Sequence, residues 1–252
     1  MRRNEEAVRL TKRASLGEVG RLRIGFFAAG VAGFLPGLVQ EYHRRFPDVD
    51  LTLHDLRPTQ QLDAFDQGQL DVGFSWPLPA ERRKEFHEEL VYTEYLQLVL
   101  PSAHPLTRNL AGDGTIGIKR LPAERFVLLH RQRAPGLYDE VLAFCRRVGN
   151  FSPQVVNEPD TMNTVLLLVE SGIGVSIVPG WARHLVRAGG LVLFCRLQPA
   201  FPVELRLSWR RGAPSSPTVE AFRELVQSQR EAIRALMDAR PSEKKQRQKR
   251  RP

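Results

Sequence analysis

Cysteine and long hydrophobic runs are both scarce in this chain of 252 residues. Only Cys145 and Cys195 occur, each beside apolar residues, which favours two buried, reduced thiols and leaves a single disulfide as the alternative. No apolar run approaches the roughly 18 residues that a membrane-spanning helix needs, and the first 20 residues are too highly charged for a secretory signal peptide. We therefore expect a cytoplasmic protein that does not bind membranes.

The sequence also lacks the common signatures of catalysis and of cofactor binding. Its six histidines are scattered, without metal-ligand spacing and without a Cys pair nearby. Gly172-Ile173-Gly174 lacks the third glycine of a dinucleotide-binding fingerprint and is typical of a turn. No phosphate-binding loop or nucleophile elbow occurs. We expect no catalytic residue, no metal and no cofactor, and hence no enzyme.

The net charge of +9 is concentrated at the two ends of the chain. Residues 240–252 hold seven Arg and Lys against one Glu, a net charge of +6, and residues 1–20 have a net charge of +2. Because the rest is nearly neutral, we expect residues 238–252 to form a disordered, solvated basic tail. A weak contact of this tail with DNA phosphates is the alternative, because it needs only charge. A general RNA- or DNA-binding protein also stays open.

The spacing of hydrophobic residues is that of a strand in some segments and that of a helix in the segments between them. This alternation is typical of an α/β protein with mostly parallel sheets covered by helices. The pattern occurs twice. The first run predicts strands at Leu22–Phe27, Val49–Leu56 and Asp71–Ser75, with helices at about Phe34–Phe46 and Thr59–Gln67. The second predicts strands at Phe126–His130, Gln154–Asn157 and Gly174–Val178, helices at Tyr138–Val148 and Asp160–Ser171, then a strand at Pro202–Trp209 and a helix at Thr218–Met237.

Five segments in register, each weak alone, resemble the effector-binding domain of LysR-type transcriptional regulators over roughly residues 4–236. They are Gly20–Phe26 running into Gly33–Pro36, then Glu41–Val49, Thr59–Leu62 with Gly68–Gly73, Leu100–Leu106, and Val169–Pro179. The resemblance implies a fold like that of the type 2 periplasmic solute-binding proteins. Each of its two lobes would hold a mostly parallel sheet covered by helices, with a ligand cleft between the lobes.

The resemblance also implies a division of the chain. Residues 1–20, with a charged helix over 4–16, would be the remnant of a linker helix; 21–99 and 201–237 would form lobe I, and 100–200 lobe II. Crossings near Leu98–Pro101 and Gln198–Phe201 would make a hinge. In the family a winged helix-turn-helix precedes the linker helix, so we expect it to be missing here, whether by excision, a short reading frame or a misplaced start.

Candidate site residues follow from the rule that ligands of open α/β sheets bind beyond the carboxyl ends of the strands. Thr59 would offer a hydroxyl to a carboxylate, or would be an ordinary helix cap. Arg131 and Arg133 suit a planar carboxylate through a bidentate fork, or are surface arginines. Asp160 could be the cap of its helix, and Trp76 could wall the cleft or pack under Pro77. The full set is Ala29, Gly30, Pro58, Thr59, Gln60, Trp76, His130, Arg131, Gln132, Arg133, Asp160 and Thr161.

Many relatives place Ser or Thr near Ala29, so the alanine here implies that backbone amides, or a less polar ligand, take that place. The resemblance implies a sensor of a small organic anion, which we expect to be a carboxylate, within a homodimer or tetramer paired through the helices at 34–46 and 138–148. DNA would be bound through the missing helix-turn-helix, or weakly through the tail. The alternatives are a free-standing solute-binding protein, against which the missing export signal argues, and an enzyme on this fold.

Overall fold

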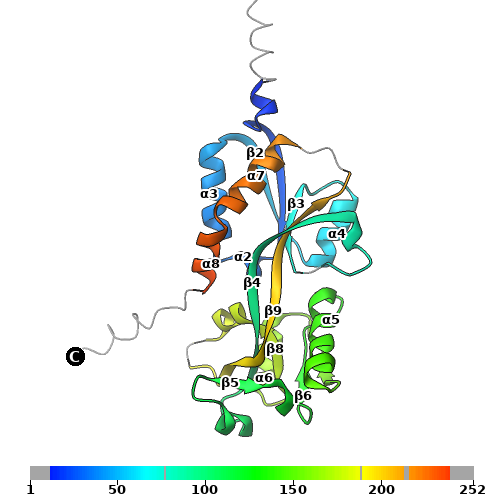
Figure 1. Cartoon of the computed structure of the whole chain (residues 1–252), viewed down its shortest axis with the longest axis vertical. Coiled ribbons are helices and arrows are strands. Elements are labelled where there is room, and N and C mark those ends of the chain that lie inside the picture. Colours follow the sequence, from blue (N-terminus) through cyan, green and yellow to red (C-terminus); the bar gives the residue numbers. More distant parts are fainter. Residues whose placement is uncertain (1–11, 77, 188, 213–215, 239–252) are drawn as a thin grey trace, which may run out of the picture. The chain divides into compact units, whose positions relative to one another are not determined.

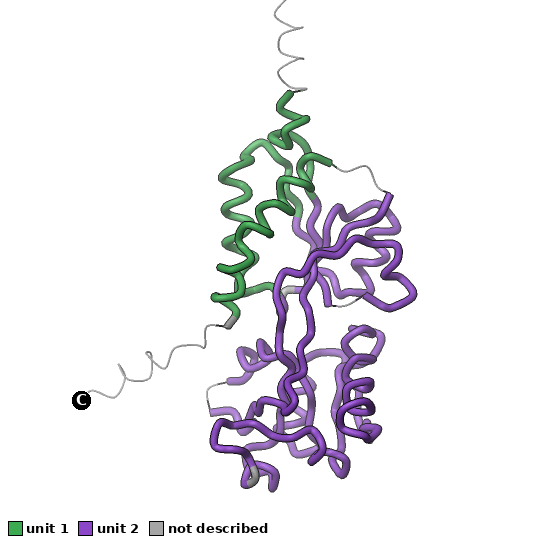
Figure 2. The backbone as a smooth tube through the Cα atoms, in the orientation of Figure 1, with its two compact units in different colours: residues 1–22, 31–52, 214–252 green, residues 23–30, 53–213 purple. Residues whose placement is uncertain are grey.

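The computed structural model describes residues 12–76, 78–187, 189–212 and 216–238 (Figure 1). The chain forms two compact units (Figure 2). Unit 1 contains Met1–Leu22, Val31–Thr52 and Pro214–Pro252, and unit 2 contains Arg23–Gly30 and Leu53–Ala213. This division differs from the predicted lobes, whose boundaries stay a prediction. The predicted helix over 4–16 is described only at residues 12–16, of which 12–15 are helical. Of the tail predicted over 238–252, residue 238 ends a helix and the rest lies outside the described residues.

Unit 1 is built around α3 (Leu35–Arg45), α7 (Pro217–Ser228) and α8 (Arg230–Asp238). The start of α3 follows its sequence, because a proline fits the first turn of a helix and Pro36 lies there. Tyr42 of α3 is buried against Phe222 of α7, with ring centroids 5.3 Å apart, and its hydroxyl donates to the Thr218 carbonyl at 3.0 Å. The single helix predicted over 218–237 is wrong in one respect, because a turn at Gln229 divides it.

The main sheet has the strand order β2-β1-β3-β9-β4-β8, and β5 pairs with β9 in addition. Strands β1 and β2 run from unit 1 into unit 2. The pair β1–β3 is parallel, whereas β9 is antiparallel to both β3 and β4. The strands are β1 (Val19–Phe26), β2 (Asp48–Asp55), β3 (Val72–Ser75), β4 (Phe86–Pro101), β5 (Thr115–Gly117), β8 (Ser176–Pro179) and β9 (Val192–Arg210). The sequence did not predict β4 or the first half of β9.

The second half of unit 2 holds a parallel pair of strands, β6 (Arg125–Val127) and β7 (Gln154–Asn157). Helix α5 (Pro135–Phe144) continues as a π-helix over Cys145–Gly149. It begins three residues before the predicted start, because Pro135 fits the first turn of a helix. The other helices are α2 (Ala28–Val31), α4 (Pro58–Asp66), α6 (Met162–Glu170) and the 3-10 helices Arg83–Glu85, Pro105–Asn109, Ile118–Arg120 and Gly180–Leu185. The α/β fold class predicted from the sequence is confirmed.

The ends of α4 and α6 follow from glycines in the left-handed region. Gly68 has a φ of 62°, and the N–H of Gln69 donates to the Ala64 carbonyl at 2.8 Å, which closes α4 as a Schellman motif. Gly172 has a φ of 76°, and the N–H of Ile173 closes α6 onto the Leu168 carbonyl in the same way. The predicted turn after α6 is confirmed.

Both cysteines are buried and unbonded, as predicted. Burial raises the pKa of each thiol, Cys145 and Cys195, to about 11, which leaves almost none of either in the reactive thiolate form at neutral pH. Within the described ranges, no helix is both long and apolar enough to cross a membrane.

Candidate functional site

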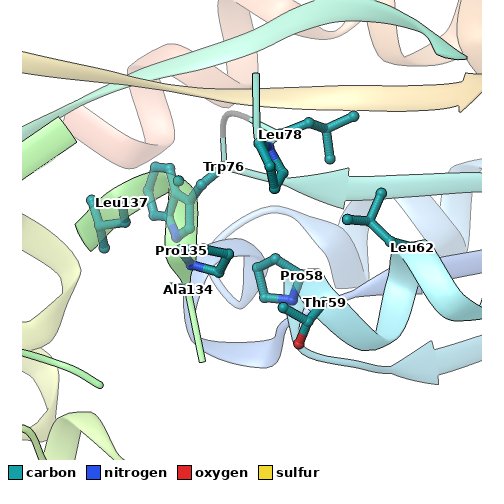
Figure 3. A pocket seen from close by; sticks show the side chains of 10 residues that line it. Pro58, Thr59, Leu62, Trp76, Leu78, Ala134, Pro135 and Leu137 are labelled. Atoms are coloured by element: carbon teal, nitrogen blue, oxygen red, sulfur yellow. The ribbon is translucent and has the colours of Figure 1, made fainter. Parts of the chain in front are cut away.

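A small cavity in unit 2 lies where the first turn of α4 meets the first turn of α5 (Figure 3). Its volume is about 10 Å³, which is the space of roughly one water molecule. Ten described residues line it: Pro58, Thr59, Leu62, Trp76, Leu78, Pro79, Ala134, Pro135, Gly136 and Leu137. We call it the proline pocket. Three of the twelve predicted site residues, namely Pro58, Thr59 and Trp76, lie together in it.

The lining of the proline pocket is almost entirely apolar. Thr59 carries the only hydroxyl among these ten residues (Figure 3), and the Trp76 indole is only 4% exposed. The Phe27 ring packs on the Trp76 ring with centroids 5.4 Å apart. Gly30 lies so close to Phe27 that a Cβ on it would come within 2.0 Å of that ring. The segment around Ala29 and Gly30, expected to be an open loop, is the short helix α2. Its glycine leaves room for the Phe27 ring, which packs on Trp76.

The start of α4 places Thr59 inside the helix and not at its N-cap. Arg57 is the N-cap residue, with an extended conformation of φ −61° and ψ 156°, so that Pro58 and Thr59 are the first two helical residues. The proposed role of Thr59 as cap is therefore wrong, because Pro58 fits the first helical position. The Gln60 side chain instead accepts a hydrogen bond from the Arg57 N–H at 3.2 Å.

Gln61 holds this helix on the ends of two strands. Its side-chain amide is 2% exposed and donates to the carbonyls of Leu56 and Phe74 at 3.0 and 3.1 Å. Because Leu56 follows β2 and Phe74 lies in β3, these bonds fix the first turn of α4 against the strand ends. In the sequence, only the place of Gln61 before Leu62 in the motif Thr59–Leu62 pointed to this role.

A charged cluster adjoins the pocket along the chain, because Arg57 precedes Pro58 and Arg133 precedes Ala134. The Arg133 Nε donates to the Asp160 carboxylate at 2.7 Å. This hydrogen bond holds the pKa of Asp160 below its usual range, and the nearby charges of Arg133, His130 and Arg57 lower it further. The Asp160 carboxylate thus lies near two guanidinium groups, those of Arg133 and Arg57, whose charges together exceed its own by one.

Neither predicted arginine is without an acidic partner. The Arg131 guanidinium makes a bidentate contact with Asp139 of α5, at 2.7 and 2.8 Å, and both side chains are largely exposed. His130 does not end a strand, because β6 stops at Val127. Its Nδ1 accepts a hydrogen bond from the Gln132 N–H at 3.1 Å, so residues 130–133 form a turn instead of a strand end.

The cap of α6 is Thr161 and not Asp160. The Thr161 hydroxyl accepts a hydrogen bond from the Thr164 N–H at 3.2 Å, as an N-cap side chain does. The expectation that Asp160 caps this helix is wrong, because Arg133 engages its carboxylate. The sequence offered both residues, and only their backbone positions decide between them.

The predicted residues thus fall into two groups. The pocket holds three of them, whereas Ala29, Gly30, Gln60, His130–Arg133, Asp160 and Thr161 are not among its lining residues. Leu62, Leu78, Pro79, Ala134, Pro135, Gly136 and Leu137 were not predicted. The run Ala134-Pro135-Gly136 was a usable signal, since it directly follows the predicted arginines. Among the described residues, no three His, Cys, Asp or Glu side chains gather as a metal site would require.

Comparison with known proteins identifies the family. Residues 15–231 match the family described as the LysR substrate binding domain. AlsR, an HTH-type transcriptional regulator of Bacillus subtilis (strain 168), is 32% identical over 180 residues, which cover 71% of this chain and 57% of AlsR. The chain therefore spans little more than half the length of that relative.

Solved structures of this kind have the same fold. The CcmR regulatory domain of Synechocystis PCC6803, in complex with 2-PG, matches with a TM-score of 0.67 and 17% identity, over 83% of this chain and 96% of that one. Full-length CbnR complexed with target DNA matches with a TM-score of 0.68 and 20% identity, over 90% of this chain and 74% of that one. Since the family match covers most of the residues, this chain belongs to the LysR substrate-binding domains.

Proposed function

We propose that this domain binds a small organic acid at the proline pocket, with the apolar part of the ligand against Trp76 and its carboxylate at Arg133. The observation that carries the proposal is the arrangement of an apolar cavity beside an excess of positive charge. An aromatic or aliphatic acid presents the same two surfaces. Thr59 would contribute a hydroxyl to the ligand, and Arg133 a guanidinium able to form two parallel hydrogen bonds with a carboxylate.

Binding would require the pocket to widen. Its free volume of about 10 Å³ is far below the several hundred Å³ typical of ligand pockets. A ligand that binds only a wider state shifts the population toward that state. The first turns of α4 and α5 would then part around the ligand, which would convert occupancy into a change of conformation.

For the whole protein we propose control of transcription in response to this ligand, through DNA binding by an oligomer. AlsR is named a transcriptional regulator, and CbnR was crystallised with its target DNA. A homodimer or tetramer remains our proposal for the assembly, with the helices α3 and α5 as the first surfaces to test.

Two arginines of the same turn provide a matched test of the binding site. A panel of small aromatic and aliphatic acids should raise the melting temperature by mass action. A ligand at a concentration of 100 Kd adds about 2.7 kcal/mol to the free energy of unfolding. Arg133→Gln should abolish this rise, because the ligand loses its charged partner. Arg131→Gln, which removes a partner of Asp139 only, should retain it. An undiminished rise in Arg133→Gln, or no rise with any acid, would contradict the proposal.

A further inference from the structure

A second cavity of unit 2 adjoins the proline pocket along helix α5. Its volume is about 20 Å³, and two of its nine described lining residues, Ala134 and Leu137, also line the proline pocket (Figure 3). We call it the methionine pocket, after Met162, which α6 contributes to the lining. Val141 of the lining lies three residues after Tyr138 and four after Leu137, so these residues share one face of α5. The two pockets therefore follow one another along a single helix face.

The lining of the methionine pocket offers hydrocarbon and almost no polar group. None of its nine described residues is charged, and Tyr138 carries the only hydroxyl. Burial, and in addition a hydrogen bond with the Glu158 side chain, raise the pKa of Tyr138 to about 12, so this hydroxyl is neutral at pH 7 and already has a partner. A carboxylate or hydroxyl of a ligand that entered this pocket would be buried without a partner of its own, which is costly.

The charged group of the proposed site lies beside two segments of this lining. Arg133 directly precedes Ala134, and Asp160 lies two residues before Met162. The ion pair of Arg133 with Asp160, at 2.7 Å, therefore joins the segment that begins α5 to the segment that begins α6. A carboxylate held at Arg133 would have its hydrocarbon chain next to the start of both helices.

Met162 allows this cavity to adapt to a chain. A volume of about 20 Å³ is the space of roughly one water molecule, and a water molecule needs polar partners that this lining scarcely provides. Met162 is only partly buried, and its unbranched thioether side chain adapts to irregular gaps. A rotation of Met162 would release a space comparable to that of an alkyl chain of the same length.

We propose that the methionine pocket receives the hydrocarbon end of the ligand, so that the domain selects monocarboxylic acids with an extended hydrocarbon chain. Short acids would leave this pocket empty, and dicarboxylic or hydroxylated acids would bury a polar group in it. The methylene groups between the two ends would lie against Leu137, which lines both pockets. This inference rests on the function proposed above, because Arg133 must hold the carboxylate.

The methionine methyl groups are a direct probe, since the chain has only three methionines. In protein labelled with ¹³C at these methyl groups, the Met162 signal is the one missing in Met162→Ala. Hexanoate should shift this signal saturably and should give a nuclear Overhauser effect between its terminal methyl group and that of Met162. Adipate, with the same number of carbon atoms and a second carboxylate, should do neither and should bind about tenfold more weakly or worse.

A series of straight-chain acids from propionate to decanoate measures the selectivity by calorimetric titration. Affinity should rise by about fourfold for each added methylene group until the pocket is full. Met162→Ala should move the affinity maximum to a longer acid, because it leaves more room. Leu168→Ala is the matched control, since Leu168 is also partly buried on α6 and packs on the same core cluster but lines neither pocket. It should leave the order of the acids unchanged.

Three results would overturn this inference alone, in a protein that still binds acids and loses them in Arg133→Gln. One is equal affinity for hexanoate and adipate. Another is an unchanged affinity maximum in Met162→Ala. The third is a Met162 signal that does not move when hexanoate saturates the protein. If no acid binds at all, the function proposed above fails, and this inference fails with it.

Discussion

Thr59 occupies the second position of α4, two residues after the N-cap residue Arg57. Its hydroxyl makes no hydrogen bond to any residue that the structure describes, and it is the only hydroxyl of the proline pocket. A side chain that stabilises nothing locally is available to a ligand. A substitution of Thr59 should therefore change ligand affinity without changing the stability of the fold, which a substitution of a cap residue could not do.

Replacing Thr59 by Val should leave the stability of the fold within about 0.5 kcal/mol of the wild type, since no cap bond is lost. The affinity for a small acid should fall, because a buried ligand oxygen loses its partner. Urea unfolding measures the first quantity and calorimetric titration the second. Thr59→Ser, which keeps the hydroxyl, should bind as the wild type does; unchanged affinity in Thr59→Val would remove this residue from the site.

Asp160 already holds the Arg133 guanidinium at 2.7 Å, so in the proposed function it would compete with a bound carboxylate. Asp160→Asn should release Arg133 and increase the affinity for small acids several-fold, as measured by the same titration. The gain should vanish when Arg133→Gln is added, because the released group is then absent. A gain that persists in the double variant would mean that Asp160 acts by repelling the ligand and not through Arg133.

At the scale of elements, the ends of the helices depend on a few positions with particular backbone angles. Gly68, in the left-handed region at φ 62°, lets the chain turn away at the end of α4. Gly37 lies inside the first turn of α3, and a Cβ on it would meet no atom within 4 Å. The two positions make a matched pair for mutation, since the backbone conformation requires glycine only at Gly68.

Gly68→Ala should lower the free energy of unfolding by about 1–2 kcal/mol, because a Cβ is strained in the left-handed region. Gly37→Ala should raise it by about 0.5–1 kcal/mol, because alanine favours the helix and has room there. Both changes can be read from urea unfolding curves of equal slope. Opposite signs are the expected result, and equal losses would mean that the conformation of Gly68 does not determine the end of α4.

At the scale of the whole molecule, several carboxylates form ion pairs with arginines of the same chain. Hydrogen bonds from Arg44 and Arg45 lower the pKa of Glu41 from 4.5 to about 2. The pKa of Asp66 is lowered mainly by its hydrogen bond with Arg210, and that of Asp139 by its bond with Arg131. Each of these groups binds protons less readily in the folded chain than in the unfolded chain.

Stability should therefore fall on acidification. A carboxylate with a lowered folded pKa stabilises the fold fully above its unfolded pKa, and this contribution disappears as the pH falls through the folded pKa. For Glu41 that window extends from about pH 5 down to about pH 2. Urea unfolding between pH 7 and pH 2 measures the effect, and Glu41→Gln should flatten the curve at its acidic end. Constant stability throughout would show that these exposed pairs are screened.

The sequence by itself determined the features that depend on near neighbours. Hydrophobic spacing placed Leu35, Leu38 and Tyr42 on the buried face of α3, and Gly68 and Gly172 marked the ends of α4 and α6. The order of the predicted strands and helices followed from the same patterns, whereas β4 and the first half of β9 did not. The five motifs led to the family. These signals are local, because period and turn conformation are properties of a few consecutive residues.

Only the tertiary structure decided which distant groups meet. The long pairing of β4 with β9 follows from contacts between distant segments and not from any local period. The same is true of the proline pocket, which both Leu78 and Leu137 line, and of the ion pairs that direct Arg133 to Asp160 and Arg131 to Asp139. A cavity or an ion pair depends on the distance between side chains, and that distance is set by the packing of the whole core.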